Sequence, residues 1–209
     1  MGERGRPRSF DRDEALRKAM ELFWSRGYEG TSVGDLTEAL GINKPSLYAA
    51  FGCKEALFRE AIELYGAVEG APIDEAMREA STARAAVEAA LRINATAYCR
   101  PDRPTGCMVV LSAITGAPEN ETVRAYVAQN RQEGRERMRQ RIERGKQEGD
   151  VPKEADAAAV AGFYTAVLHG LSVEARDGAR PEALAAAVDC ATAAWDAVCA
   201  VRPVAGDGR

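Results

Sequence analysis

Residues 31–54, TSVGDLTEALGINKPSLYAAFGCK, decide the fold of this chain. They predict two short helices joined by a tight turn and followed by the start of another helix. Ser32 is a suitable N-cap for the first helix, because Asp35 can complete a capping box. Gly41 permits a sharp stop, and Asn43 is a suitable N-cap for the second helix. A helix, a glycine-containing turn and a second helix form the helix-turn-helix pattern, whose second helix enters the major groove of DNA.

The run from Gly41 to Phe58, GINKPSLYAAFGCKEALF, resembles the DNA-binding domain of the TetR family of bacterial transcriptional repressors. The resemblance covers roughly the first quarter of the chain, from Phe10 to Phe58, and beyond it only the all-helical layout is similar. Members of that family are homodimers that bind operator DNA and release it when a small molecule enters the C-terminal domain. The resemblance therefore implies a ligand-responsive regulator that binds double-stranded operator DNA. A repressor is the default, although an activator would have the same features.

Charge is distributed unevenly along the chain. The formal net charge is −4, yet Arg4, Arg6 and Arg8 lie in the first nine residues against Glu3 alone. This basic arm could enter the minor groove beside the recognition helix, or it could be a solvated tail. The overall acidity argues against a non-specific architectural DNA-binding protein, which would need a far more basic surface.

The second helix of the motif carries few hydrogen-bond donors. Lys44 and Ser46 can reach base edges or phosphates, and Ala49 can touch a thymine methyl. Tyr48 could be a packed aromatic, but the family resemblance implies a contact with the DNA backbone. Helix N-termini attract phosphate and supply further candidates. The predicted DNA-binding residues are Arg4, Arg6, Arg8, Thr31, Ser32, Lys44, Pro45, Ser46, Tyr48, Ala49 and Lys54.

The segment after the motif predicts the division into domains. Lys54 to Tyr65 is expected to form a helix that links the DNA-binding head to the body, and Gly66, Gly70 and Pro72 are expected to break it. We therefore expect a DNA-binding domain at residues 1–65 and an effector-binding and dimerisation domain at residues 66–209.

The remainder of the chain has no strand pattern and is expected to be a helical bundle. Gly- and Pro-rich breaks separate helical runs at residues 81–100, 105–115, 119–148, 153–177 and 180–200. The predicted fold is thus all-α, with a three-helix DNA-binding domain followed by this bundle.

The last two runs carry the signal for a partner subunit. Apolar residues in 180–200 step by four and three, which is typical of a helix that packs along a neighbour. Both apolar faces could be buried inside one subunit, but the resemblance favours a symmetric four-helix dimer interface. The predicted interface residues are Leu168, Leu171, Leu184, Val188, Ala191 and Trp195. His169, the one histidine, is interpreted as a structural hydrogen-bonding residue near that interface.

An effector pocket is expected among the middle helices. Asn94 and Asn130 each interrupt an apolar stripe, and buried amides need partners, which could be a ligand, each other or a water. Cys107 could be a small hydrophobe or a sensor of electrophiles or oxidants. The predicted ligand-binding residues are Asn94, Tyr98, Cys107, Met108, Leu111, Asn130, Phe163 and Tyr164.

The sequence offers no constellation for catalysis. It has one histidine, no Gly-rich phosphate loop after a strand and no Gly-x-Ser-x-Gly motif. We therefore expect no catalytic residues and no enzymatic activity. The alternatives are a redox- or electrophile-sensing regulator of the same fold that uses Cys107 and, more remotely, a helical ligand-binding protein or enzyme with a vestigial DNA-binding head.

The compartment is inferred from cysteine usage and hydropathy. No stretch approaches the roughly 18 consecutive apolar residues of a membrane span, and no apolar run follows the basic N-terminus as in a signal peptide. The five cysteines are an odd number without a Cys-x-x-Cys pair, which argues for reduced thiols rather than disulfides or zinc. We expect a cytoplasmic protein with no membrane partner, no metal site and no cofactor.

Overall fold

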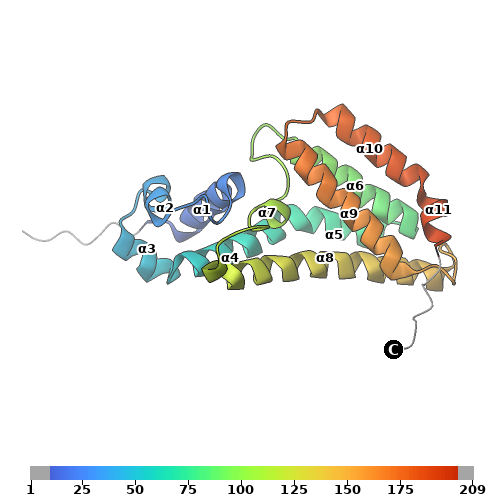
Figure 1. The fold of residues 1–209 in the computed structure, drawn as a ribbon, viewed down its shortest axis with the longest axis horizontal. Coiled ribbons are helices and arrows are strands. Elements are labelled where there is room, and N and C mark those ends of the chain that lie inside the picture. The colour runs from blue at the N-terminus through green and yellow to red at the C-terminus, as the bar shows by residue number, and fades with distance from the viewer. Residues whose placement is uncertain (1–9, 202–209) are drawn as a thin grey trace, which may run out of the picture.

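The structure, a computed structural model, describes residues 10–201, and all the secondary structure in that range is helical (Figure 1). The predicted all-α fold is therefore confirmed. The helices are α1 (Arg12–Arg26), α2 (Val33–Leu40), α3 (Lys44–Phe51), α4 (Lys54–Tyr65), α5 (Ala71–Glu79), α6 (Ala83–Tyr98), α7 (Met108–Leu111), α8 (Glu121–Glu148), α9 (Ala157–Arg176), α10 (Pro181–Ala193) and α11 (Trp195–Cys199). The predicted arm residues Arg4, Arg6 and Arg8 lie outside the described range.

Helices α1 to α3 gather with α4 into a head at one end of the molecule (Figure 1). The Ser32 hydroxyl accepts the Asp35 N–H at 3.1 Å, and the Asp35 carboxylate accepts the Ser32 N–H at 2.7 Å, so the predicted capping box is present. Gly41 ends α2 with a φ of +66°, where glycine has no steric penalty. Asn43 caps α3 by accepting the Ser46 N–H at 2.9 Å. The predicted helix-turn-helix is confirmed.

Aromatic rings fill the centre of the head. The rings of Phe23 and Tyr28 each meet the ring of Phe58 edge-on, with centroids 5.0 Å apart in both pairs. Leu36 of α2 and Leu47 of α3 are completely buried in the same cluster. This core holds α3 against the rest of the head and so fixes the face that α3 turns to solvent.

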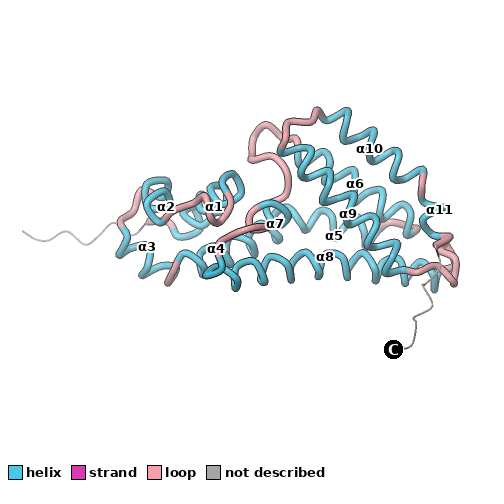
Figure 2. The backbone as a smooth tube through the Cα atoms, viewed as in Figure 1, coloured by secondary structure: helices cyan, strands magenta, loops and turns pink. Residues whose placement is uncertain are grey.

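Helix α4 continues into a π-helical segment, Gly66–Gly70, and then into α5 (Figure 2). The α-helix ends at Tyr65 as expected, but Gly66, Gly70 and Pro72 do not interrupt the helical path, which continues through the π turn into α5. Pro72 lies in the first turn of α5, and the wider π turn before it accommodates the missing proline N–H. The linker between head and body is therefore one long helix with a widened turn, which we call the linker helix (residues 54–79).

Helices α6, α8, α9 and α10 pack together as the body (Figure 2). Buried apolar side chains, among them Leu91, Ile142, Tyr164 and Leu184, fill the space between these helices. By length and composition alone, α9 could cross a membrane. In this structure it packs against α6, α8 and α10.

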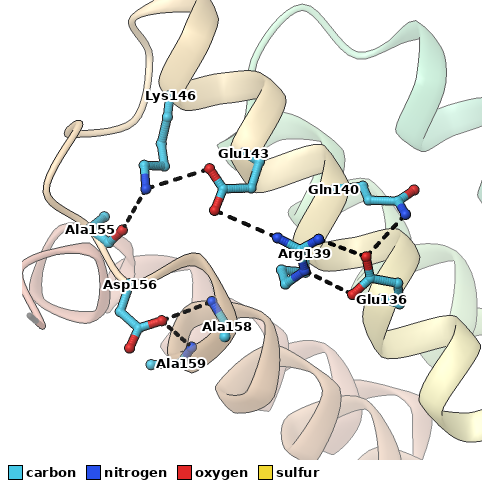
Figure 3. A network of polar contacts seen from close by, with 9 residues as sticks. All are labelled: Glu136, Arg139, Gln140, Glu143, Lys146, Ala155, Asp156, Ala158 and Ala159. Carbon is cyan, nitrogen blue, oxygen red and sulfur yellow. Dashed lines mark hydrogen bonds and ion pairs between the residues drawn. The ribbon is translucent and has the colours of Figure 1, made fainter. Parts of the chain in front are cut away.

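Polar contacts tie α8 to α9 at the end of the body away from the head (Figure 3). Asp156 caps α9 by accepting the N–H groups of Ala158 and Ala159, both at 3.0 Å. Lys146 of α8 donates to the carbonyl oxygen of Ala155 at 3.0 Å. These bonds fix the connection between the two helices.

Two predicted helical runs differ from the structure. Within residues 105–115 only the short α7 forms, because Gly106 has a φ of +73° and turns the chain before the helix starts. The run 180–200 is divided at Ala194 into α10 and α11. The runs 81–100, 119–148 and 153–177 correspond to α6, α8 and α9.

Gly106 is the point where the head meets α6 and α9. Its carbonyl oxygen accepts the indole N–H of Trp24 at 3.0 Å, and its own N–H donates to the Tyr98 carbonyl oxygen at 3.0 Å. A side chain at this position would meet the Ser172 carbonyl oxygen at 2.6 Å. A residue without Cβ is therefore needed where the loop after α6 passes between head and body.

The head shares its apolar core with segments from beyond residue 65. Met108 of α7 and Val123 and Val127 of α8 are buried in the same cluster as Phe23 and Phe58. The predicted division into domains at residues 1–65 and 66–209 stays a prediction about function. One apolar core contains residues from both sides of this boundary.

Candidate functional site

Helix α3 presents a polar face to solvent. Lys44, Pro45 and Ala49 are exposed, and Tyr48 is 46% exposed, whereas Leu47 is completely buried. Tyr48 is therefore not a packed core aromatic. The exposed face has the size and chemistry to enter a major groove, because it combines one cation, one phenol and small side chains.

The N-termini of α2 and α4 contribute less to this face than the sequence suggests. Thr31 is completely buried, and its hydroxyl donates to the Gly27 carbonyl oxygen at 2.7 Å, so its prediction as a DNA contact is corrected. Ser32 is exposed at the start of α2. Lys54 holds its Nζ 4.0 Å from the centre of the Tyr28 ring, and burial lowers its pKa. The Lys54 ammonium group thus already makes a cation–π contact within the head.

A cavity of about 190 Å³ lies between the linker helix and helices α6, α8 and α9. The linker helix supplies one wall, and Cys107, Val109 and Val110 line the pocket from the N-cap and first residues of α7. The lining residues are Ile62, Tyr65, Gly66, Glu69, Gly70, Ile73, Asp74, Met77, Ala90, Asn94, Tyr98, Cys107, Val109, Val110, Asn130, Arg131, Gly134, Arg135, Arg137, Met138, Thr165, Leu168 and His169. Four of the predicted ligand-binding residues are among them: Asn94, Tyr98, Cys107 and Asn130.

The two pocket asparagines do not bond to each other. Asn94 Nδ2 donates to the Ala90 carbonyl oxygen at 2.8 Å, and Asn130 Nδ2 donates to the Tyr126 carbonyl oxygen at 2.9 Å. Each amide thus uses one donor on the carbonyl four residues earlier in its own helix. This arrangement holds both side chains against their helices at the pocket wall.

Ionisable groups gather around Cys107 at one end of the pocket. Burial raises the pKa of Tyr65 and of Tyr98 well above the ordinary value, and the nearby Cys107 thiol acts in the same direction on both. Burial lowers the pKa of Arg131, and the interaction with Cys107 acts in the opposite direction. Burial and the charge of Arg131 lower the pKa of His169, so the imidazole is neutral at neutral pH. His169 itself lines the pocket rather than the predicted dimer interface.

The other four predicted ligand-binding residues lie elsewhere. Met108 is fully buried in the core of the head, and Leu111 does not line the cavity. Phe163 is 40% exposed on the outer face of α9, while the Tyr164 hydroxyl donates to the Ala191 carbonyl oxygen inside the body. These four predictions are corrected. Sequence distance from Cys107 and apolar character alone do not decide which face of a helix a residue occupies.

Most of the predicted dimer residues are buried inside one protomer. Leu171, Leu184, Val188, Ala191 and Trp195 all belong to the core of the body. Leu168 lines the pocket instead. The alternative that these helices bury their apolar stripes within one subunit is thus correct for these residues, and the interface prediction is corrected.

Another face of α9 and α10 remains open to solvent. On α9 it consists of Phe163, Ala166, Gly170 and Val173, and on α10 it consists of Ala183, Ala186, Ala187 and Cys190. Phe163 and Val173, both on α9, are each 40% exposed, so two large apolar side chains reach solvent on this face.

Two sequence profiles of known families match the chain. Residues 15–61 match the profile described as bacterial regulatory proteins, tetR family. Residues 83–191 match the profile described as Tetracyclin repressor-like, C-terminal domain. The chain belongs to the TetR family. It is therefore a DNA-binding transcriptional regulator, as the sequence predicts.

Whole-length relatives support the same TetR assignment. The chain is 37% identical over 186 residues to the HTH-type transcriptional repressor ComR of Escherichia coli (strain K12), with 87% of each chain covered. It is 32% identical over 202 residues to the HTH-type transcriptional repressor BdcR of the same organism, covering 91% of this chain and 89% of BdcR.

A solved structure of a TetR family transcriptional regulator, CifR, is also similar. A cysteine mutant of CifR complexed with 26 bp double-strand operator DNA matches with a TM-score of 0.89 and 46% identity. The match covers 91% of this chain and 100% of the CifR chain. The TetR fold thus extends over nearly all of the described residues.

The matching family and relatives are described as transcriptional regulators and not as enzymes. Among residues 10–201 no three or more His, Cys, Asp or Glu side chains come together in a way that could hold a metal ion.

Proposed function

We propose that this chain is a homodimeric cytoplasmic repressor, without enzymatic activity or a cofactor, that binds operator DNA through α3 and releases it when a small molecule occupies the pocket. The observation that carries this proposal is the linker helix. One continuous helix runs from the N-terminus of α4, beside α3, along the wall of the pocket to Met77. Occupancy of the pocket and the position of the head therefore share one rigid element.

On the DNA side, the proposed contacts are those of the exposed face of α3 and the helix ends next to it. Lys44 and Ser46 would reach base edges or phosphates, Ala49 and Pro45 would meet apolar groups, and Tyr48 would donate to a phosphate. Ser32 and Lys54 would add phosphate contacts, and the arm residues Arg4, Arg6 and Arg8 would enter the minor groove. The operator complex of CifR supports this assignment, because that relative is similar over nearly the whole chain.

For the dimer, we propose the exposed face of α9 and α10 in place of the buried stripes. Phe163, Gly170 and Val173 of α9 would meet the same residues of a second copy around a two-fold axis. Small alanines on α10 would permit close approach of the helices. Two heads would then be spaced for successive major grooves, roughly 34–36 Å apart or somewhat more.

Coupling in this proposal is a shift between two spacings of the heads. A ligand that binds more tightly to the pocket at one spacing favours that spacing and weakens operator binding by the same free energy. The pocket residues Tyr65, Ile73 and Met77 all belong to the linker helix, so a ligand there presses on the element that carries the head.

The test is an anisotropy titration of the full chain against labelled DNA from immediately upstream of its own gene. Scrambled DNA is the control, at two salt concentrations. Lys44→Ala and Tyr48→Ala should each weaken specific binding by about tenfold or more, as expected for lost phosphate or base contacts. Lys153→Ala, an equal change of charge at an exposed position near the start of α9, should leave it unchanged. Equal binding of both DNAs would reject a local operator.

A cysteine-sensing regulator of the same fold is the second candidate, because Cys107 lines the pocket beside Tyr65 and Tyr98. The comparisons do not favour it over reversible ligand binding. Cys107→Ser separates the two. A reversible effector would still release the Cys107→Ser variant from DNA, whereas a thiol-dependent signal would be lost.

A further inference from the structure

The two carboxylates at the pocket already have cationic partners. Glu69 forms an ion pair with Arg103, a residue of the loop after α6. Asp74 Oδ1 lies 3.4 Å from Arg137 Nε across the mouth of the pocket. Each carboxylate thus faces an arginine, which offsets its charge at the pocket.

Arg131 is different, because it is half-buried and brings a charge without a carboxylate. Arg135 also lines the pocket, but it is exposed and donates to the Ala158 carbonyl oxygen at 3.3 Å. Arg131 Nη1 donates to the carbonyl oxygen of Val109 at 3.0 Å, which uses one of five N–H donors. Within residues 10–201 no carboxylate oxygen lies within 4 Å of its guanidinium. The neighbouring His169 is neutral and so supplies no countercharge. A half-buried guanidinium keeps its proton at any physiological pH, so the site carries an uncompensated positive charge.

Tyr98 adds an unused donor at the same end. The residue is 2% exposed, and its hydroxyl has no hydrogen-bond partner in the structure. A buried hydroxyl without a partner costs roughly 1–3 kcal/mol, so such groups are rare unless something else satisfies them. Tyr98, Cys107 and Arg131 all line the same pocket, so the Tyr98 hydroxyl and the Arg131 guanidinium belong to one cavity wall.

Apolar side chains supply most of the remaining surface of the pocket. The side chains of Ile62, Ile73, Met77, Val110 and Leu168 line it. A cavity of about 150 Å³ can hold a benzene ring, and this one measures about 190 Å³. The space therefore suits one ring, or an alkyl chain of similar volume, with a small polar substituent.

From these contacts we infer that the effector is a small organic carboxylate, whose apolar body fills the pocket and whose carboxylate pairs with Arg131 and accepts a hydrogen bond from Tyr98. This inference rests on the proposed function, since it names the class of molecule to which the pocket responds. A neutral molecule of the same shape leaves the charge of Arg131 unpaired, and a cation is repelled by it. A bidentate pair with a carboxylate satisfies both Arg131 and Tyr98.

The test is titration calorimetry on the full chain without DNA, using benzoate, phenylacetate and 3-phenylpropanoate, each against its primary amide. At least one carboxylate should bind about tenfold or more tightly than its amide, as expected for a charge-assisted hydrogen bond. Arg131→Gln should abolish this preference while the amide affinity stays the same. Arg139→Gln is the matched control on the same helix, because Arg139 pairs with Glu136 and Glu143 away from the cavity (Figure 3).

Two further variants keep the test decisive if Arg131→Gln does not fold. Arg131→Lys retains the charge without the planar fork and should keep part of the preference. Tyr98→Phe should weaken carboxylate binding while raising the melting temperature of the ligand-free protein, because it removes the unpartnered hydroxyl. If each carboxylate binds no more tightly than its amide, or if Arg131→Gln keeps the preference, the inference is overturned.

Repeating the operator anisotropy titrations in the presence of each carboxylate and each amide separates this inference from the proposed function. Carboxylate binding without any change in operator affinity would support the anion site and reject the proposed coupling to DNA. Release of the operator by the amides as effectively as by the carboxylates would support the coupling and overturn the anion site.

Discussion

Arg176, in the last turn of α9, donates through Nη2 to the carbonyl oxygen of Trp24 at 2.8 Å and caps the end of α1. Its Nη1 donates to the carbonyl oxygen of Ser25 at 2.9 Å. Helix C-termini leave carbonyl groups without intrahelical partners, and a cation satisfies them well. A single side chain of the body thus holds the first helix of the DNA-binding head.

Replacement of Arg176 should weaken the hold of the body on the head. We expect Arg176→Met to lower the free energy of unfolding by about 1–2 kcal/mol, because two charge-assisted hydrogen bonds are lost while the aliphatic stem remains. Urea denaturation measures this. Arg180→Met, at an exposed arginine that caps no carbonyl in the structure, is the control and should unfold like the natural protein.

Substitution of Thr31 should change stability but not DNA binding, whereas substitution of Lys44 should change DNA binding but not stability. Thr31→Val removes a buried hydroxyl that bonds to Gly27 and should cost about 1 kcal/mol of stability, with operator affinity unchanged where the protein is folded. Lys44→Ala should leave stability unchanged and reduce the salt dependence of operator binding by about one ion. Melting curves and anisotropy titrations at several salt concentrations measure both. A loss of operator affinity in folded Thr31→Val would restore Thr31 as a DNA contact.

Gly106 and Gly149 permit a matched pair of substitutions. Both have positive φ, +73° and +87°, but a Cβ at Gly106 would meet the Ser172 carbonyl oxygen at 2.6 Å, whereas a Cβ at Gly149 would meet nothing within 4 Å. We expect Gly149→Ala to cost about 1 kcal/mol for the backbone conformation alone. Gly106→Ala should cost clearly more, because the loop must also move. Equal losses in urea denaturation would mean that the close packing at Gly106 relaxes freely.

His169 should make stability depend on pH. Burial and Arg131 lower its pKa in the folded protein below the unfolded value of about 6.5. The unfolded chain therefore binds this proton more readily, and stability is lost as the pH falls from about 6.5 towards the lower folded value. His169→Gln should show a smaller loss of stability between pH 7.5 and pH 5.5 than the natural protein. An identical loss in both would assign the pH dependence to other groups.

Glycines within α8 should respond according to the space around them. A Cβ at Gly134 has only Arg137 Nη2 near it, at 3.9 Å, so Gly134→Ala should stabilise the protein by up to about 1 kcal/mol through helix propensity. A Cβ at Gly145 would meet the Ala83 Cβ at 2.7 Å, and Gly145→Ala should destabilise it despite the same gain in propensity. Thermal unfolding of the two variants checks the signs.

The features that the sequence predicts correctly are those set by near neighbours. The Ser32–Asp35 capping box and the Asn43 cap involve residues three apart, so the chain contains the whole interaction locally. The exposed face of α3 follows from the same short range, since burying Leu47 leaves Tyr48 outside. The prediction that Thr31 contacts DNA is wrong, because its hydroxyl bonds to the Gly27 carbonyl oxygen. The position of that carbonyl is set by the turn at the end of α1, which the sequence pattern does not specify.

The body is harder to predict because the choice between core and interface is made in three dimensions. Trp195 and Leu184 have the same apolar pattern whether they meet a second subunit or α9 of their own. Arg131 belongs to an arginine-rich helix, and nothing in the sequence separates it from its exposed neighbours. Its half-buried position, without a carboxylate partner, follows from where α7 and the linker helix lie.

The widened turn at Gly66–Gly70 keeps the linker helix in phase with the pocket. Ile62 and Met77 both line the pocket with Tyr65 and Ile73 between them, so one side of the helix faces the cavity throughout. Four turns of a regular α-helix take roughly 14.4 residues, and each residue turns the helix by about 100°. Ile62 and Met77 are 15 positions apart, so the widened turn takes up the residue that four regular turns leave over. Inserting one further residue would rotate Ile73 and Met77 by about 100° away from the side occupied by Ile62 and Tyr65. For this wall of the pocket, the number of residues in the segment matters more than their identity.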